Sequence, residues 1–154
     1  MTDTALHCAL KDELAALERV VALLHDEQRV LTHARIEQLA DISEQKSRAV
    51  AELENLTATR RALVQAREIP DDGSAISAWL SSHEPALLET WETLIDLARE
   101  ASQLNKSNGK LIAGREEANR TLLNLLLADH EAGDSYSADG RLAHRAPRRP
   151  LDRA

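Results

Sequence analysis

The residues of this chain that could carry out chemistry are six histidines, 26 acidic side chains and one cysteine. A di-iron site in a helical bundle requires Glu-x-x-His pairs on two helices, but no histidine here has a glutamate three residues before it. The chain also has no His-Glu-x-x-His zinc motif, no cysteine pair, no glycine-rich phosphate loop and no serine–histidine–acid grouping. The sequence therefore predicts no catalytic residues, no metal and no cofactor, and indicates that the protein is not an enzyme.

The distribution of charge excludes a further class of function. The net charge is −7, but residues 135–154 contain five arginines and two aspartates, so residues 1–134 carry about −10. Nucleic-acid binding requires a basic face, and the acidic body argues against it. The acidic residues stand mostly beside arginine and lysine, which is typical of a solvated surface.

The chain has no recognisable secretory signal, no apolar run near 20 residues, and in Cys8 a single cysteine that cannot form an intramolecular disulfide. We therefore expect a cytoplasmic protein that does not insert into a membrane.

The remaining candidate chemistry is apolar binding by the segment TLLNLLLA, residues 121–128. At about 100° per residue, its leucines span an arc of roughly 200°, wider than a bundle helix needs for its own partners. If three of them face the protein's own helices, Leu123 and Leu127 face outward, where an amphipathic partner helix could bind. The alternative is that a neighbouring copy or the protein's own first helix covers the whole arc. The predicted partner-binding leucines are Leu122, Leu123, Leu125, Leu126 and Leu127.

The element that must position these leucines is a long helix from Pro85 to Glu131. Its apolar residues recur at alternating steps of three and four, which predicts a helix that packs along its flank against other long helices. Roughly 47 residues at about 1.5 Å each give a length of about 70 Å. The row consists of Leu94, Leu97, Ala101, Leu104, Asn108, Leu111, Ala118, Leu122 and Leu125, interrupted by Arg115.

Asn108 and Gly109 interrupt the apolar character of this row. A polar amide on such a row costs stability and tends to fix the register of packed helices. Glycine inside a helix costs about 1 kcal/mol relative to alanine, so Gly109 suggests a close backbone approach or a bend. The alternative is that the two residues mark only a tolerated kink.

The first 67 residues predict a helical hairpin. Leucines at heptad spacing, from Leu10 to Leu31, indicate a helix over residues 4–31, and a second helix is expected over residues 35–67. The break rests on a loss of phase near residues 32–35, so a single helix through residue 67 is the alternative. IPDDGS, residues 69–74, predicts a turn, and a short helix over residues 75–81 presses Trp79 onto the bundle.

Together these elements predict an all-α fold, an elongated antiparallel helical bundle or coiled coil of three long helices and one short helix. Residues 1–134 form the bundle and residues 135–154 a flexible basic C-terminal tail. Trp79 and Trp91 are expected to close the end of the bundle as core residues.

The order of these features resembles the FlgN-type flagellar export chaperones over about residues 6–141. The N-terminal half is similar in its leucine helix, its short turn and a second helix with a central lysine, Lys46, that ends near Arg60. The C-terminal half resembles the family signature in one set of residues, namely Asn105, Asn108, Gly109, Leu111, Ile112, the leucines that follow, Tyr136 and Asp139-Gly140-Arg141.

The resemblance implies a cytoplasmic chaperone that binds the helical ends of the hook-filament junction proteins before type III export and prevents their premature association. It implies that Leu122–Leu127 and Tyr136 contact cargo, and that Asn105, Asn108 and Gly109 support that helix. The flagellar export apparatus is then a further partner, and a homodimer is an additional assembly to test. Two alternatives are a self-associating coiled-coil adaptor and a sister chaperone for filament or filament-cap subunits.

Overall fold

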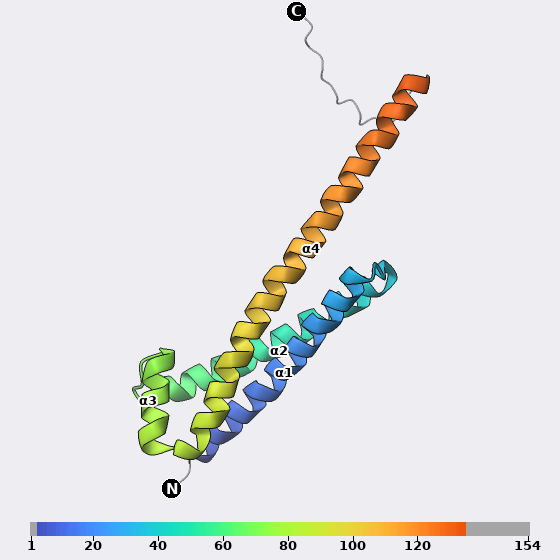
Figure 1. The fold of residues 1–154 in the computed structure, drawn as a ribbon. Helices are drawn as coiled ribbons and strands as arrows, with labels where there is room; N and C mark the ends of the chain where they lie inside the picture. Colours follow the sequence, from blue (N-terminus) through green and yellow to red (C-terminus); the bar gives the residue numbers. More distant parts are fainter. Residues whose placement is uncertain (1–2, 135–154) are drawn as a thin grey trace, which may run out of the picture. The chain divides into compact units, whose positions relative to one another are not determined.

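The computed structural model describes residues 3–134, and side chains as far as residue 128. Over this range the fold is all-α, as predicted (Figure 1). The three long helices are α1 (Thr4–Thr32), α2 (Leu39–Ala66) and α4 (Leu88–Asp134), and the short helix is α3 (Gly73–His83). Single 3-10 turns, η1 (Ile36–Gln38) and η2 (Pro85–Leu87), precede α2 and α4. The chain divides into two compact units, residues 1–111 and residues 112–154.

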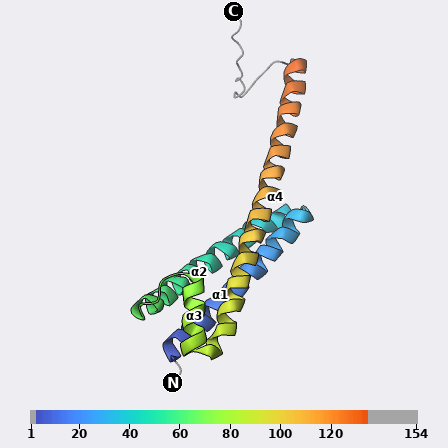
Figure 2. The ribbon, with the colours of Figure 1, turned by 60° about the vertical axis from the view of Figure 1, so that its left-hand side comes forward.

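Helices α1 and α2 form the antiparallel hairpin, and they lie side by side in both ribbon views (Figures 1 and 2). The Asp3 side chain caps α1 by accepting a hydrogen bond from the Leu6 amide, 3.1 Å away. At the other end, Ala34 adopts a φ of 59°, a left-handed conformation that reverses the chain without glycine. The single helix through residue 67 is therefore excluded.

Helix α3 begins two residues earlier than the sequence suggested because Asp72 caps it, accepting a hydrogen bond from the Ala75 amide at 3.0 Å. Trp91, at the start of α4, is buried, and its indole N–H donates to the Ser77 hydroxyl of α3 at 3.1 Å. Trp79 is half-buried and stacks on the His83 ring at 4.6 Å. Both rings therefore serve the core, as predicted.

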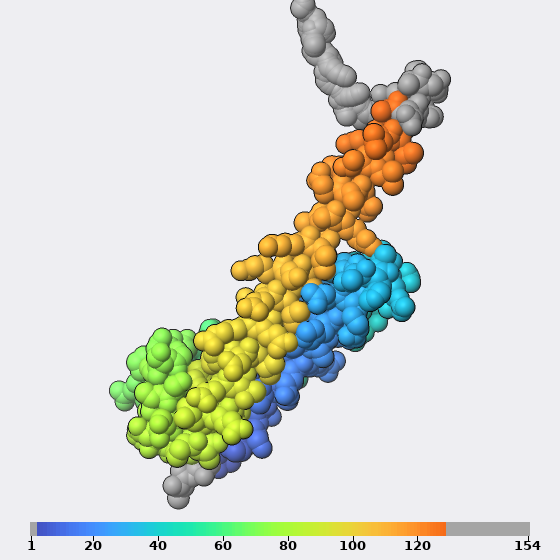
Figure 3. All heavy atoms as spheres, in the orientation of Figure 1, coloured from blue at the N-terminus to red at the C-terminus, as the bar shows by residue number. Residues whose placement is uncertain are grey.

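Within residues 1–111, the first turns of α4 run parallel to α1. Residue 84, which precedes α4, hydrogen-bonds to residue 3, and Asn108 hydrogen-bonds to Leu24 and Glu27 near the far end of α1. Figure 3 shows the first half of α4 lying along α1. The apolar contacts come from Leu94, which is buried, and from three partly buried α4 residues, Leu97, Ala101 and Leu104.

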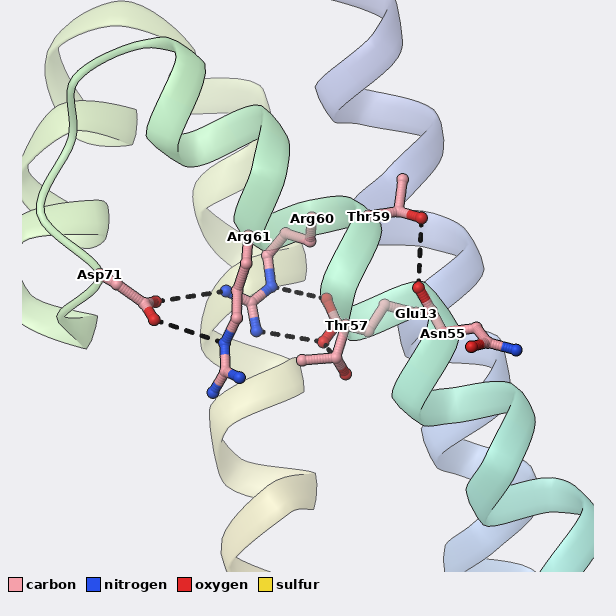
Figure 4. A network of polar contacts seen from close by, with 7 residues as sticks. All are labelled: Glu13, Asn55, Thr57, Thr59, Arg60, Arg61 and Asp71. Carbon is pink, nitrogen blue, oxygen red and sulfur yellow. Dashed lines mark hydrogen bonds and ion pairs between the residues drawn. The ribbon is translucent and has the colours of Figure 1, made fainter.

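Two buried glutamates correct the expectation that the carboxylates form only a solvated surface. Glu13 and Glu27 of α1 are 3% and 1% exposed. We call Glu13, Thr57 and Arg60 the Glu13 cluster (Figure 4), in which the Arg60 Nε lies 2.7 Å from a Glu13 oxygen and the Thr57 hydroxyl donates to Glu13 at 2.8 Å. The Arg60 guanidinium also lies 5.1 Å from the centre of the Trp91 ring. This cluster joins α1 to α2.

Candidate partner-binding surface

The candidate surface is a set of five leucines on α4, which we call the leucine face. The segment stays helical because it contains no proline and consists mostly of good helix formers. Residues four positions apart lie on the same side of a helix, so residues 122 and 126 form one row and residues 123 and 127 form the neighbouring row. The two rows together make one broad leucine stripe. The exposed fractions are 55% for Leu122, 59% for Leu123, 62% for Leu125, 56% for Leu126 and 48% for Leu127.

These fractions differ from one part of the sequence-based interpretation. The interpretation in which Leu122, Leu125 and Leu126 continue the buried row expects them to be covered, yet they are as exposed as Leu123 and Leu127. The row of α4 becomes exposed before it reaches them, since Leu111 is already 39% exposed. All five leucines are exposed, so over the described residues the arc is an apolar surface.

The family-motif residues fall into different environments. Asn108 is 1% exposed, Ile112 is half-buried, and Asn105 and Gly109 are exposed. A Cβ atom built on Gly109 would meet nothing within 4 Å, so the expected close backbone approach is wrong. Tyr136, and the tail of residues 135–154, lie outside the described residues.

Asn108 belongs to a buried polar group that includes one residue from each long helix, and we call Glu27, Lys46 and Asn108 the Glu27 cluster. The Lys46 ammonium donates to both Glu27 oxygens, at 3.0 and 2.8 Å. The Asn108 Nδ2 donates to a Glu27 oxygen and to the Leu24 carbonyl, both at 2.9 Å. Asn108 therefore makes specific polar contacts and is more than a tolerated kink.

Glu27 and Lys46 were not predicted as partners. The available signal was the heptad row Leu6, Glu13, Val20 and Glu27, in which two glutamates occupy positions that face the other helices. Lys46 was noted only as the central lysine of the second helix. A carboxylate on such a row needs a cationic partner, which a search of the facing helix at the same depth could have found.

A second polar junction holds the start of α1 near the end of α2 and the start of η2. The Asp3 amide donates to the buried Glu84 carboxylate at 2.7 Å, and the Asp3 carboxylate pairs with Arg67 at the end of α2. Burial raises the pKa of Asp3, but hydrogen bonds from the Leu6 amide and the Arg67 guanidinium outweigh it and hold the pKa below its ordinary value. Asp3 is therefore a charged cap at neutral pH.

Among the side chains of residues 3–128, no three histidine, cysteine or acidic groups come close enough to hold a metal ion together. Within the same range, no helix combines the length and the apolar character needed to cross a membrane.

A family model described as FlgN protein matches residues 1–144. The chain belongs to the FlgN family. This confirms the family predicted from the sequence. A flagella synthesis protein FlgN of Proteus mirabilis is 29% identical over 133 residues, which cover 84% of each chain. The FlgN protein of Yersinia enterocolitica is 31% identical over 138 residues, 88% of this chain and 87% of that relative. No solved structure matches the chain significantly.

Proposed function

We propose that this FlgN-family protein is a cytoplasmic flagellar export chaperone that binds hook-filament junction proteins before type III secretion and prevents their premature association. The observation that carries the proposal is the leucine face, five adjacent leucines that are each 48–62% exposed. Soluble proteins rarely leave so contiguous an apolar surface uncovered unless a partner binds it. The names of the relatives, both flagella synthesis proteins, support the flagellar role.

The mode of binding follows from the geometry of the face. An amphipathic cargo helix presents an apolar stripe with anchors at steps of three and four residues, and Leu123 and Leu127 form a matching pair one turn apart. Burying this stripe would stop the cargo helix from associating with other subunits. Reversible burial needs no nucleotide in the chaperone, and release is left to the export apparatus. We propose Tyr136 and the tail of residues 135–154 as a second contact with cargo.

The test is the affinity of the full-length chain for purified junction proteins, measured by isothermal titration calorimetry. We expect Leu123→Asp with Leu127→Asp to weaken binding by at least about 100-fold, since each buried leucine contributes about 1.5–3 kcal/mol. Helicity and melting temperature should stay at wild-type values because both side chains are exposed.

The matched control is Thr121→Asp with Asn124→Asp, which adds the same two charges to the opposite, exposed side of the same helical turns. This control should bind cargo with wild-type affinity. Unchanged binding by the Leu123 and Leu127 variant would exclude the leucine face as the cargo site. Preference for the filament or filament-cap subunit would replace the cargo assignment with the sister-chaperone alternative.

Light scattering separates the remaining alternative, a self-associating adaptor. We expect a wild-type monomer in the absence of cargo, so that the leucine face is available. A stable dimer that dissociates on Leu123→Asp with Leu127→Asp would show that a second copy occupies the face, and would contradict the chaperone proposal.

A further inference from the structure

The residues of α4 that face the hairpin form two sets with a spacing of seven positions. In one set, the same residue type occupies three successive positions. Leu97, Leu104 and Leu111 occupy the same position in successive heptads, and the first two pack against the hydrophobic core. Displacing α4 by one heptad toward its N-terminus, about 10 Å at 1.5 Å per residue, puts Leu104 and Leu111 where Leu97 and Leu104 now lie. The opposite displacement puts Thr90 in the place of Leu97. Apolar burial on this half therefore opposes the second displacement but not the first.

The other half of the row contains Leu94, Ala101 and Asn108, and its polar member is the one that differs chemically. A one-heptad displacement would put either Ala101 or Arg115 where Asn108 now lies. With Ala101 there, the Glu27 carboxylate and the Leu24 carbonyl would lose their amide donor inside the core. With Arg115 there, a second cation would be buried beside the Lys46 ammonium, which already donates to both Glu27 oxygens.

The Glu27 cluster is at the same time a costly way to fill a core. Glu27 is 1% exposed, and its charge is removed from water. The Asn108 Oδ1 is buried and has no hydrogen-bond partner among the described residues. Apolar side chains of similar volume would fill the same space without desolvating a charge or leaving an acceptor unpaired, so net stability does not explain the cluster.

We infer that the Glu27 cluster selects the register of α4 against the α1–α2 hairpin and does so without adding net stability. Each long helix contributes one member, and the amide of Asn108 bonds to two acceptors on α1 at once, which only one axial position of α4 satisfies. A single polar residue at a heptad position is an established way to specify register at a cost in stability.

The test measures the axial position of α4 in the full chain. Nitroxide labels are attached to Lys11→Cys on α1 and Lys106→Cys on α4, both exposed positions, in a Cys8→Ser background, and the label–label distance is measured by pulsed electron paramagnetic resonance. The wild-type cluster should give one distance. Glu27→Leu with Lys46→Met and Asn108→Leu should melt at an equal or higher temperature and give additional distances, displaced by about 10 Å for one heptad.

A second variant keeps the buried ion pair and alters the amide alone. Asn108→Ala makes positions 101 and 108 identical, so the amide no longer distinguishes neighbouring registers, and we again expect more than one distance. One unchanged distance in both variants would overturn the inference. A lower melting temperature of the triple variant would also overturn it, because the cluster would then contribute net stability.

The matched control removes the other buried ion pair. Glu13→Leu with Arg60→Met replaces the pair in the Glu13 cluster, which joins α1 to α2 and also contacts the Trp91 ring of α4, and leaves the Glu27 cluster intact. This variant should keep the single wild-type distance. Additional distances in the control would show that loss of any buried charge loosens α4, and would contradict a specific role for the Glu27 cluster.

Discussion

Leucines at two places on the same helix have opposite environments. Leu94 of α4 is 4% exposed and belongs to the core, whereas Leu125, thirty-one residues further along the same helix, is 62% exposed. Both lie on the row that the heptad spacing predicts to be apolar. Periodicity therefore identifies the face of a helix that requires a partner, but the partner comes from the hairpin for Leu94 and from another molecule, in our proposal, for Leu125.

The largest expected difference is in the free energy of unfolding when a carboxylate replaces leucine at position 94 or at position 125. Leu94→Asp buries a carboxylate without a partner and should lower the free energy of unfolding by more than about 5 kcal/mol, enough to unfold residues 1–111. Leu125→Asp should change it by less than about 0.5 kcal/mol because the side chain is already in water. Urea denaturation followed by circular dichroism measures both. Equal destabilisation would show that Leu125 is buried in solution.

Breaking an ion pair should likewise cost more stability in residues 1–111 than in the exposed part of α4. Glu13→Ala leaves the buried Arg60 guanidinium with only its longer, 4.0 Å contact to the exposed Asp71 carboxylate, and we expect the free energy of unfolding to fall by about 3–5 kcal/mol. Glu117→Ala breaks the exposed pair with Arg120 and should cost less than about 1 kcal/mol. Urea midpoints of the two single variants test the contrast. A small effect of Glu13→Ala would mean that water reaches Arg60.

The cap at Asp3 should make the stability of residues 1–111 depend on pH. The folded pKa of Asp3 is lowered, so its contribution is complete above the unfolded pKa and is lost as the pH falls through the lower, folded pKa. Asp3→Asn retains a capping side chain but does not titrate. The wild type should therefore be more stable than Asp3→Asn at pH 7, and the difference should shrink in acid. Thermal melts of both proteins between pH 7 and pH 2 measure this, and a constant difference would contradict it.

The smallest expected effects are the gains in helix stability when alanine replaces either of two glycines of α4. A Cβ atom meets nothing within 4 Å at Gly109 or at Gly114. Replacement by alanine should therefore gain up to about 1 kcal/mol of helix stability at each position. Gly109→Ala lies within residues 1–111 and should raise the urea midpoint, whereas Gly114→Ala should raise mainly the helical circular dichroism signal. If Gly114→Ala raised the urea midpoint and Gly109→Ala did not, the prediction that the two residues belong to separate units would be contradicted.

Much of the fold could be predicted because its signals are local. The heptad leucines of α1, the turn at residues 69–74 and the absence of proline between residues 86 and 131 each act through neighbouring residues, and the observed helix bounds agree closely. The turn after α1 was harder to place, because Ala34 adopts a left-handed conformation usually taken by glycine. The start of α3 was predicted at residue 75, but Asp72 caps the helix and it begins at Gly73.

Less of the polar interior could be predicted, because it depends on which residues meet between helices. The sequence showed Asn108 on the apolar row, but its bonds to Leu24 and Glu27 span more than eighty positions. The Glu13–Arg60 pair likewise joins residues forty-seven positions apart. Composition alone made these glutamates look like part of the solvated surface.

The sequence by itself determined the all-α class, the three long helices and the presence of more leucine on α4 than one bundle face requires, because helical periodicity and turn chemistry are properties of short segments. The tertiary structure decided which of these leucines the hairpin covers, and that Glu27, Lys46 and Asn108 meet in one buried cluster. Burial and ion pairing depend on distances between separate helices, and residue spacing along one helix does not contain them.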